Sequence, residues 1–473
     1  MNAWRTVLKL EWRILGRDRA SAMMLVAFAV AVVIAAAAGG RLAQGTRAAQ
    51  QKAVSDHQAR YEATRKALDV AAASNEPLAA SDPRDPLWMG EEGAAQLIVL
   101  PPNPLGAIAV GQRSLRPQSF AVSTAAHLVS ERETESAIVG PTRLLSGAFD
   151  PAFVFVVLFP LLVIALSYEL LSGERERGTL AMLLSQPVSQ RDLVGGKAAA
   201  RAVLVCVSAL VLAAIGLIVG GADLGQPNAW LHAALYAAVV VSWALVWFAA
   251  SVFVNARGGT SERNALVLVG GWLVFVVVLP GLVHAAIDSV VPPPSRMELV
   301  HETREAADEM ERKLAGLRGR HDRNTKTRKY ASELIEVKEA LAKRAAPVVE
   351  EMQVALDRRA GLLDNLRFSS PALIVQVALE DIAGSGSTRH RIFEKQVDAH
   401  HRVFQKHFFA LARSGKRFAP ANTPSIPGFA FEDQPVSELV TRVAIGVFVL
   451  LLLAGLLLAG AWPALRRVGR LTR

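Results

Sequence analysis

The chain contains a single cysteine, Cys206, among its 473 residues. One thiol cannot close an intramolecular disulfide, so a fold stapled by disulfides is excluded. Cys206 lies within the apolar run 202–222, and a thiol in apolar surroundings is inert. We therefore expect Cys206 to act as a small apolar side chain without a chemical role.

The sequence also lacks the motifs of several enzyme classes. A P-loop requires G-x-x-x-x-G-K-[ST], because backbone amides hold the phosphates and the hydroxyl binds magnesium. The nearest string, Gly195-Gly196-Lys197-Ala198, lacks the first glycine at the right spacing and the hydroxyl residue. Neither H-E-x-x-H nor G-x-S-x-G occurs. We expect no catalytic residue and no nucleotide site in this chain.

Side chains that could bind a metal gather in one stretch, 390–407. They are His390, Asp398, His400, His401 and His407. His400 and His407 are two helical turns apart on one face. No cysteine accompanies them, and the spacing of known zinc motifs is absent. The pattern therefore favours a solvated helix face over a metal site.

The composition is typical of a polytopic membrane protein. Hydrophobic residues make up 52% of the chain, the mean hydropathy is +0.30 and the formal charge is +10. A basic balance can indicate a nucleic-acid partner. Here the basic residues bracket apolar runs and do not line one patch, so we expect a lipid bilayer as partner and no nucleic acid.

Six stretches have the roughly 20 apolar residues that cross a bilayer core. They are 20–40, 149–171, 202–222, 229–256, 264–287 and 443–465. The sequence thus predicts a mainly α, polytopic membrane protein with six transmembrane helices. Two large insertions, 41–148 and 288–442, interrupt the series.

The basic residues predict the orientation of these spans. Lys and Arg are frequent in the short segments 1–19, 172–201, 257–263 and 466–473, whereas 223–228 has none. Because positive segments stay cytoplasmic, both termini are expected in the cytoplasm and both insertions outside. Large outer regions without disulfides suit the periplasm, and hence a bacterial inner membrane.

The insertions contain helical and extended patterns. Apolar residues recur at helical spacing in 297–366, which predicts an antiparallel helical hairpin whose second arm Pro347 should kink or interrupt. The stretch 41–70 is expected to continue the first span outward, and 97–123 to form short strands around turns. The hairpin is either a structural stalk or a surface for a substrate or partner.

Two further features lie near the cytoplasmic face. Residues 3–17 form an amphipathic pattern in which Trp4 and Trp12 suit the headgroup region, so an interfacial elbow helix is expected before the first span. Glu169 is an ionisable residue near the inner end of the second span. Structural tolerance is the simpler interpretation of this residue, and a gating role is the alternative.

The loop between the second and third spans carries the most specific pattern. Residues 174–197 read E-R-E-R-G-T-L-A-M-L-L-S-Q-P-V-S-Q-R-D-L-V-G-G-K. Thr179 can cap a short helix over 180–185, Pro187 ends it, and Ser189 with Asp192 fits a capping box for the next helix. The pattern E-x-G-T-L-x-x-L-L-S-x-P-V-S-x-x-x-L-x-x-x-K resembles the loop after the second span of type-2 ATP-binding-cassette (ABC) permeases.

Other segments extend this resemblance over most of the chain. The strings P-L-G-A-I-A-V-G-Q-R-S-L (104–115), P-T-R-L-L-S-G-A-F-D (141–150) and S-P-A-L-I-V-Q-V-A-L-E-D-I-A-G (370–384) are similar to one branch of these permeases. That branch has large periplasmic domains that were long of unknown function. The hairpin itself has no sharp motif, so no role is carried over to it.

The resemblance implies that the loop holds a coupling helix that docks on a separate ATPase. Leu180, Leu183 and Leu184 would form the apolar face of that helix, and Glu174, Glu176 and Arg177 its rim contacts. The motif also includes Gly178, Thr179, Pro187 and Lys197. ATP and magnesium would be bound by the partner ATPase and not by this chain.

The function implied is that of a permease subunit of an ABC exporter. It would pair with ABC ATPase subunits and with a second copy or a related permease, and it could meet a periplasmic or outer-membrane partner. One alternative keeps the ATPase and makes the outer stalk a mechanotransmission module. Another is a receptor or scaffold in the membrane, which would need no ATPase.

Overall fold

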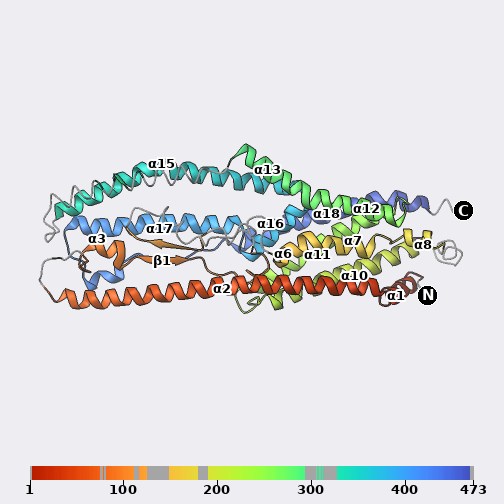
Figure 1. Ribbon diagram of the computed structural model, residues 1–473, viewed down its shortest axis with the longest axis horizontal. Coiled ribbons are helices and arrows are strands. Elements are labelled where there is room, and N and C mark those ends of the chain that lie inside the picture. Colours follow the sequence, from red (N-terminus) through yellow and green to blue (C-terminus); the bar gives the residue numbers. More distant parts are fainter. Residues whose placement is uncertain are drawn as a thin grey trace.

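One helix, α2 (Arg19–Ala72), runs along most of the molecule (Figure 1). Its 54 residues correspond to about 81 Å at 1.5 Å per residue. The Asp18 carboxylate begins it by accepting hydrogen bonds from the amides of Ala20 and Ser21, at 3.1 and 3.3 Å. The expected extension of the first span over 41–70 is therefore confirmed.

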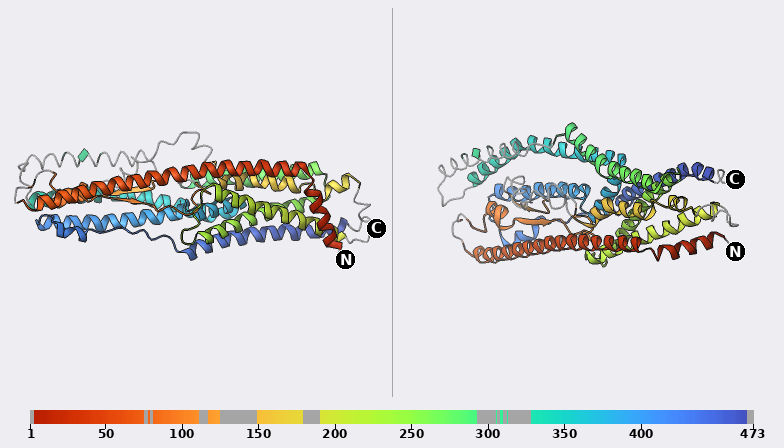
Figure 2. Two further views of the ribbon diagram at one scale, coloured as in Figure 1. Left: turned by 90° about the horizontal axis from the view of Figure 1, so that it is seen from below. Right: turned by 45° about the vertical axis from the view of Figure 1, so that its right-hand side comes forward.

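The computed structural model describes residues 3–74, 78, 81–110, 117–124, 149–178, 190–292, 305, 308–309, 312 and 328–468. Within them, a bundle of apolar helices occupies one end of an elongated molecule (Figures 1 and 2). The other end, here called the distal unit, comprises the described residues of 45–124 and 328–435. Both chain ends lie at the bundle end, here called the proximal end.

In the part of the chain that the structure describes, six helical stretches are long and apolar enough to cross a membrane, and each coincides with a predicted span. They are Arg19–Ala72, Pro151–Glu176, Val194–Val219, Ala229–Asn255, Ser261–Val290 and Val436–Ala464. The predicted class, a mainly α polytopic membrane protein, is confirmed. Three spans lie on the unbroken helices α10 (Gln190–Val219), α11 (Ala229–Asn255) and α18 (Val436–Val468).

The second and fifth spans are interrupted by π-helical turns. The second consists of α6 (Pro151–Phe153), η3 (Val154–Leu158), α7 (Phe159–Ser167) and α8 (Ser172–Glu176). The fifth consists of α12 (Ser261–Trp272), η4 (Leu273–Val278) and α13 (Leu279–Val290). Each π turn comes just before a proline, Pro160 or Pro280, which has no N–H to donate.

Side chains from other elements satisfy carbonyl groups of these π turns. Trp243 Nε1 donates to the carbonyl of Phe155 at 3.0 Å, and Trp272 Nε1 donates to that of Val157 at 2.8 Å. In the fifth span, Ser370 Oγ donates to the carbonyl of Phe275 at 2.7 Å. An unsatisfied carbonyl is costly in lipid, so these bonds stabilise the π-helical turns in both spans.

Helix α11 lies at the centre of the bundle and packs against α7, α10, α12, α16 and α18. Its side chains Tyr236 and Trp243 are among the largest that are fully buried. The ring of Tyr236 meets Phe155 edge to face, with centroids 5.9 Å apart. The apolar core of the bundle therefore surrounds α11 and not the exposed α2 or α12.

The distal unit combines helices with a small sheet. Its elements are α3 (Pro86–Trp88), η1 (Met89–Gly93), β1 (Gln96–Val99), β2 (Ser119–Val122), α15 (Arg328–Leu366), η5 (Arg367–Ser369), α16 (Pro371–Ala383), α17 (Ser387–Ser414) and η6 (Pro420–Ser425). β1 and β2 are antiparallel, with Gln96 opposite Val122 and Val99 opposite Ser119. The predicted strands within 97–123 are thus present.

A separate core of aromatic side chains fills the distal unit. Phe393, Phe404 and Phe408 of α17 are fully buried against residues of α2, η1 and the sheet. On the same helix His390 and His401 are buried and His400 is half-buried. The expectation of a solvated face for these histidines is wrong, because α17 is covered by the sheet on one side and by α15 on another.

The predicted hairpin of 297–366 is described mainly in its second arm. That arm is α15, and Pro347 lies inside the helix and does not end it. Of the two outcomes expected at Pro347, the interruption is therefore excluded, and the kink stays a prediction. Most of the first arm lies outside the described residues, so the hairpin as a whole stays a prediction.

Helix α2 passes two neighbouring segments where only glycine fits. A Cβ atom on Gly39 would collide with the carbonyl oxygen of Ala107, and one on Gly40 would lie 2.9 Å from that of Gly220. Backbone oxygens cannot swing away as a side-chain end can. The absence of side chains at these two positions brings α2 against the loop at 107 and the end of α10.

We predict that Gly39→Ala lowers the free energy of unfolding by about 1–3 kcal/mol, the usual range for overpacking. The matched control is Gly45→Ala on the same helix, where a Cβ would meet nothing within 4 Å. That change should stabilise the helix by up to about 1 kcal/mol. Thermal melting of both variants in nanodiscs checks this, and equal melting temperatures would contradict it.

Burial lowers the pKa of His400 and of His407, because desolvation disfavours the charged imidazolium. The unfolded chain, whose histidines titrate near pH 6.5, therefore binds more protons than the folded chain in acid. The stability that these residues contribute is present above about pH 6.5 and is lost as the pH falls through that value.

We expect the amides of α17 to exchange with deuterium faster at about pH 5.5 than at pH 7.5, after correction for intrinsic rates. The double variant His400→Gln/His407→Gln should reduce this dependence. His284→Gln, at an exposed position on α13, should leave it unchanged. If the pH response is the same in all three proteins, the pH dependence does not come from His400 and His407.

Candidate coupling site at the proximal end

A buried carboxylate joins the first helix to the third span. Glu11 on α1 (Ala3–Leu15) is only 2% exposed. Its Oε1 lies 3.2 Å from Nε of Arg201, and its Oε2 lies 3.6 Å from Nζ of Lys197. Both cations belong to α10, against which α1 packs. The elbow helix is thus fixed to α10 by charge.

The same cations reach the second span. Lys197 Nζ also forms an ion pair with Glu174 of α8, and Arg201 Nη1 donates to the carbonyl of Leu166 at 2.9 Å. Acidic and basic groups therefore alternate from α1 through α10 to α8. Alternation matters here because a buried charge is stable only when opposite charges and hydrogen bonds compensate its lost hydration.

Glu176 connects α8 to the start of the fifth span. Its carboxylate accepts a hydrogen bond from the backbone amide of Ser261 at 2.6 Å and another from the Ser261 hydroxyl at 2.9 Å. Ser261 is the first residue of α12. A carboxylate at a helix N-terminus is favoured by free amide groups and by the helix dipole, so Glu176 stabilises the junction of α8 and α12.

The fully buried Asn255, at the end of α11, holds the turn that precedes α8. Its Oδ1 accepts hydrogen bonds from the amide of Leu171 and from Asn264 Nδ2, both at 3.3 Å. Its Nδ2 donates to the carbonyls of Ser167 and Ser251, at 3.3 and 2.9 Å. One side chain thus makes four hydrogen bonds that join α7, α11 and α12.

Helix α8 is followed by Gly178, two residues beyond its end, whose positive φ of 71° is a conformation that favours glycine. Just before it, Arg177 forms an exposed ion pair with Glu169 at 3.4 Å. Glu169, for which a gating role is the alternative interpretation, therefore has its partner directly after α8. The Arg177 guanidinium remains largely exposed, which leaves it accessible to another protein.

The residues of the expected coupling helix lie outside the described residues. These are Thr179, Leu180, Leu183, Leu184 and Pro187. The flanking motif residues Glu174, Glu176 and Lys197 are described, and the structure places all three in contacts within the chain. Their expected contacts with an ATPase stay predictions, as does the docking role of the helix.

Of the two expected membrane anchors, Trp12 lies on α1 with its side chain 40% exposed. Trp4 lies on the same helix, and its side chain is outside the described part of the structure. The helical elbow that the amphipathic pattern predicts is present. Its contact with a headgroup region stays a prediction.

Sequence reasoning did not assign Glu11, Asn255, Ser261 or Asn264 to this site. Glu11 had a visible signal, since it is the only acidic residue in 3–17 among several basic ones. Asn255 lies at the end of the fourth span and Asn264 near the start of the fifth. These places suggest positions at the membrane interface but not a contact between the two side chains.

Together these contacts hold the described residues on both sides of 179–189. Before the segment, Glu174, Glu176 and Asn255 hold α8 and the turn that precedes it to α10, α11 and α12. After the segment, Lys197 holds α10 to α1 and α8. The charged groups of this region are therefore paired with one another within the chain.

Comparisons with known proteins agree with this architecture. The model of the ABC-2 family transporter proteins matches residues 5–462. The probable ABC transporter permease protein NosY of Stutzerimonas stutzeri is 26% identical over 145 residues, which are 30% of this chain and 52% of NosY. The chain thus spans about half the length of that relative.

The bundle of six apolar helices among the described residues defines a polytopic membrane protein. Because the family model matches nearly the whole sequence, the chain belongs to the ABC-2 transporter family and is an ABC-2 type permease.

We predict that Glu11→Gln lowers the free energy of unfolding by about 2–3 kcal/mol. Removing one partner of a buried ion pair costs up to about 3–5 kcal/mol, and here Lys197 retains Glu174. The matched control is Glu62→Gln, at an exposed position on α2. Thermal melting in nanodiscs measures the difference. Equal melting of the two variants would show that the Glu11 contacts contribute nothing.

Proposed function

We propose that this chain is the permease subunit of an ATP-driven exporter and that residues 172–201 couple it to a separate ATPase. The observation that carries the proposal is the anchoring of both ends of this segment by buried ion pairs and hydrogen bonds. Membership of the ABC-2 family supports the permease role. The name of the NosY relative supports a permease within an ABC transporter.

In this proposal the apolar face of Leu180, Leu183 and Leu184 inserts into a groove of the ATPase, and Arg177 adds an exposed charge at the rim. Closure of the ATPase subunits on ATP then moves 179–189. Because Glu176 is bonded to Ser261 and Lys197 to Glu11, the movement reaches α12 through one contact and α1 through the other. ATP and magnesium are bound by the partner.

The proximal end is assigned to the cytoplasm because short basic segments cluster there. The distal unit then lies in the periplasm of a bacterial cell and the six spans in its inner membrane. Two copies of this chain, or this chain and a related permease, would enclose the pathway. The export direction rests on the family resemblance alone.

A second function, mechanotransmission to periplasmic proteins, is favoured by the helices that join the two ends. Helix α2 is continuous from the bundle into the distal unit, and α15 adds 39 residues beside α17. Movement at the proximal end would be delivered far from the membrane without transport of a cargo. A receptor or scaffold is the remaining alternative, and it would not bind an ATPase.

We predict that Leu183→Asp/Leu184→Asp abolishes co-purification with the partner ATPase. Two carboxylates cannot enter an apolar groove without a large desolvation cost. ATP hydrolysis in lipid nanodiscs should fall to the rate of the ATPase alone. The experiment uses the full chain expressed together with a candidate P-loop ATPase.

The matched control is Val354→Asp/Leu356→Asp, which places the same charges on exposed apolar positions of α15. This variant should retain the ATPase and its stimulated activity. Binding of the ATPase by both variants would refute coupling through 180–185. Failure of the unmodified chain to retain any ATPase would favour the receptor or scaffold.

A further inference from the structure

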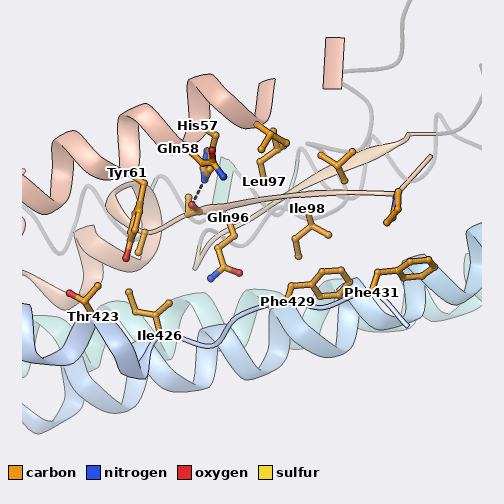
Figure 3. A pocket seen from close by; sticks show the side chains of 15 residues that line it. His57, Gln58, Tyr61, Gln96, Leu97, Ile98, Thr423, Ile426, Phe429 and Phe431 are labelled. Atoms are coloured by element: carbon orange, nitrogen blue, oxygen red, sulfur yellow. Dashed lines mark hydrogen bonds between the residues drawn. The ribbon is translucent and has the colours of Figure 1, made fainter. Parts of the chain in front are cut away.

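A pocket of about 550 Å³ opens in the distal unit between α2, β1 and the segment 423–431 (Figure 3). Its lining includes six consecutive residues, 94–99, which are the whole of β1 and the two residues before it. Side chains alternate between the two faces of a strand. A pocket lined by consecutive residues therefore runs along the edge of the strand and not over one face.

The pairing of the sheet shows which backbone groups lie at this edge. The amide of Leu100 donates to the carbonyl of Gln118 at 2.9 Å. Since hydrogen-bonded pairs alternate in an antiparallel ladder, Gln96 and Ile98 bond to β2, and the backbone groups of Leu97 and Val99 point to the opposite edge. Among the described residues, neither Leu97 nor Val99 has a partner for these groups.

The neighbouring carbonyl confirms this direction. Ala95 follows the same alternation, and its carbonyl oxygen lies 2.6 Å from Nε2 of His57 on α2. Helix α2 thus bonds the outward carbonyl just before β1. The outward backbone groups of Leu97 and Val99 have no such partner among the described residues. The open edge ends at Leu100, which pairs with β2, and at Pro101, which has no amide to offer.

We propose that this groove binds an extended, uncharged polypeptide segment of another protein, which adds to the sheet as a strand beside β1. Its backbone would exchange hydrogen bonds with Leu97 and Val99. Strand addition to an exposed sheet edge is an established mode of peptide recognition, with affinity from the main chain and specificity from side-chain pockets. The site does not depend on ATPase coupling.

The spacing of the free groups favours a peptide over a small molecule. The outward amides and carbonyls repeat every second residue, about 6.6–6.8 Å apart. A second strand has the same period and can pair with all of them. The length of β1, four residues, sets the length of the segment that pairs.

The lining predicts which side chains the segment carries. None of its fifteen residues is Asp, Glu, Lys or Arg, although 20% of the chain is charged. Figure 3 shows Gln96 and Ile98 pointing toward the segment of Ile426 and Phe429, and Leu97 pointing toward α2. Side chains on one face of the bound strand would meet aromatic rings, and those on the other would meet Gln58 and His57.

The first test measures binding of a capped, fluorine-labelled hexapeptide of alternating valine and threonine to the full chain in nanodiscs, by ¹⁹F NMR titration. A series of peptides carries one N-methyl group at each successive amide. Methylation of amides that face β1 should weaken binding about tenfold, and methylation of the intervening amides should have little effect. This two-residue alternation is the signature of strand pairing.

The second test changes the protein. Leu97→Pro removes the outward amide of β1 without touching the ladder to β2, since proline is tolerated at a strand edge. It should weaken the peptide about tenfold. The matched control is Ala121→Pro, which lies opposite Leu97 on β2 and faces the other edge of the same sheet. It should bind as the unmodified chain does.

Three results would overturn the proposal. The first is no binding of any peptide, and the second is equal binding of all N-methylated peptides. The third is self-association of the chain that Leu97→Pro abolishes while no peptide binds, which would assign the edge to a second copy. Should Leu97→Pro fail to fold, the peptide series on the unmodified chain still decides.

Discussion

The hydrogen bonds of Asn255 are the interaction on which the proximal end depends. A helix in lipid satisfies its backbone groups internally, so the backbone bonds of a span do not connect it to its neighbours. The side-chain amide of Asn255 makes this connection at the end of the fourth span. It bonds to the amide of Leu171 and the carbonyl of Ser167 in the second span, and to Asn264 in the fifth. The ion pairs of Glu11 and Glu174 then add α1 and α10 to the same frame.

A second frame of charges joins the distal unit to the bundle. Arg442 at the start of the sixth span bonds to Asp364 of α15 at 2.8 Å and to Asp381 of α16 at 3.1 Å. Asp150 reaches across from the second span, accepting hydrogen bonds from the amides of Val110 and Phe153 at 2.8 and 2.9 Å. The two ends of the molecule are thus joined by fixed contacts and by the continuous α2, and not by a flexible linker.

The spans were predictable because apolar length is a local property of the sequence, and α2 was predictable because its helical pattern continues past residue 40. The contacts of the candidate site were not. Glu11 and Arg201 are 190 residues apart, and Asn255 and Leu171 are 84 apart, so no spacing encodes their meeting. The burial of His390 and His401 was missed for a similar reason. Their helix is polar on that face, and only the packing of the sheet and α15 covers it.

The absence of a side chain at Gly39 has a geometric consequence for α2. At this position only a glycine fits between the helix and its neighbour, and beyond that point the helix continues to Ala72. About 33 residues beyond the contact make an arm of roughly 50 Å, so a tilt of about 5° around the contact displaces the tip by roughly 4 Å. Gly39 therefore divides α2 into a shorter part among the spans and a longer part beside the sheet, so a small rotation at Gly39 gives a larger displacement at the far end of the helix.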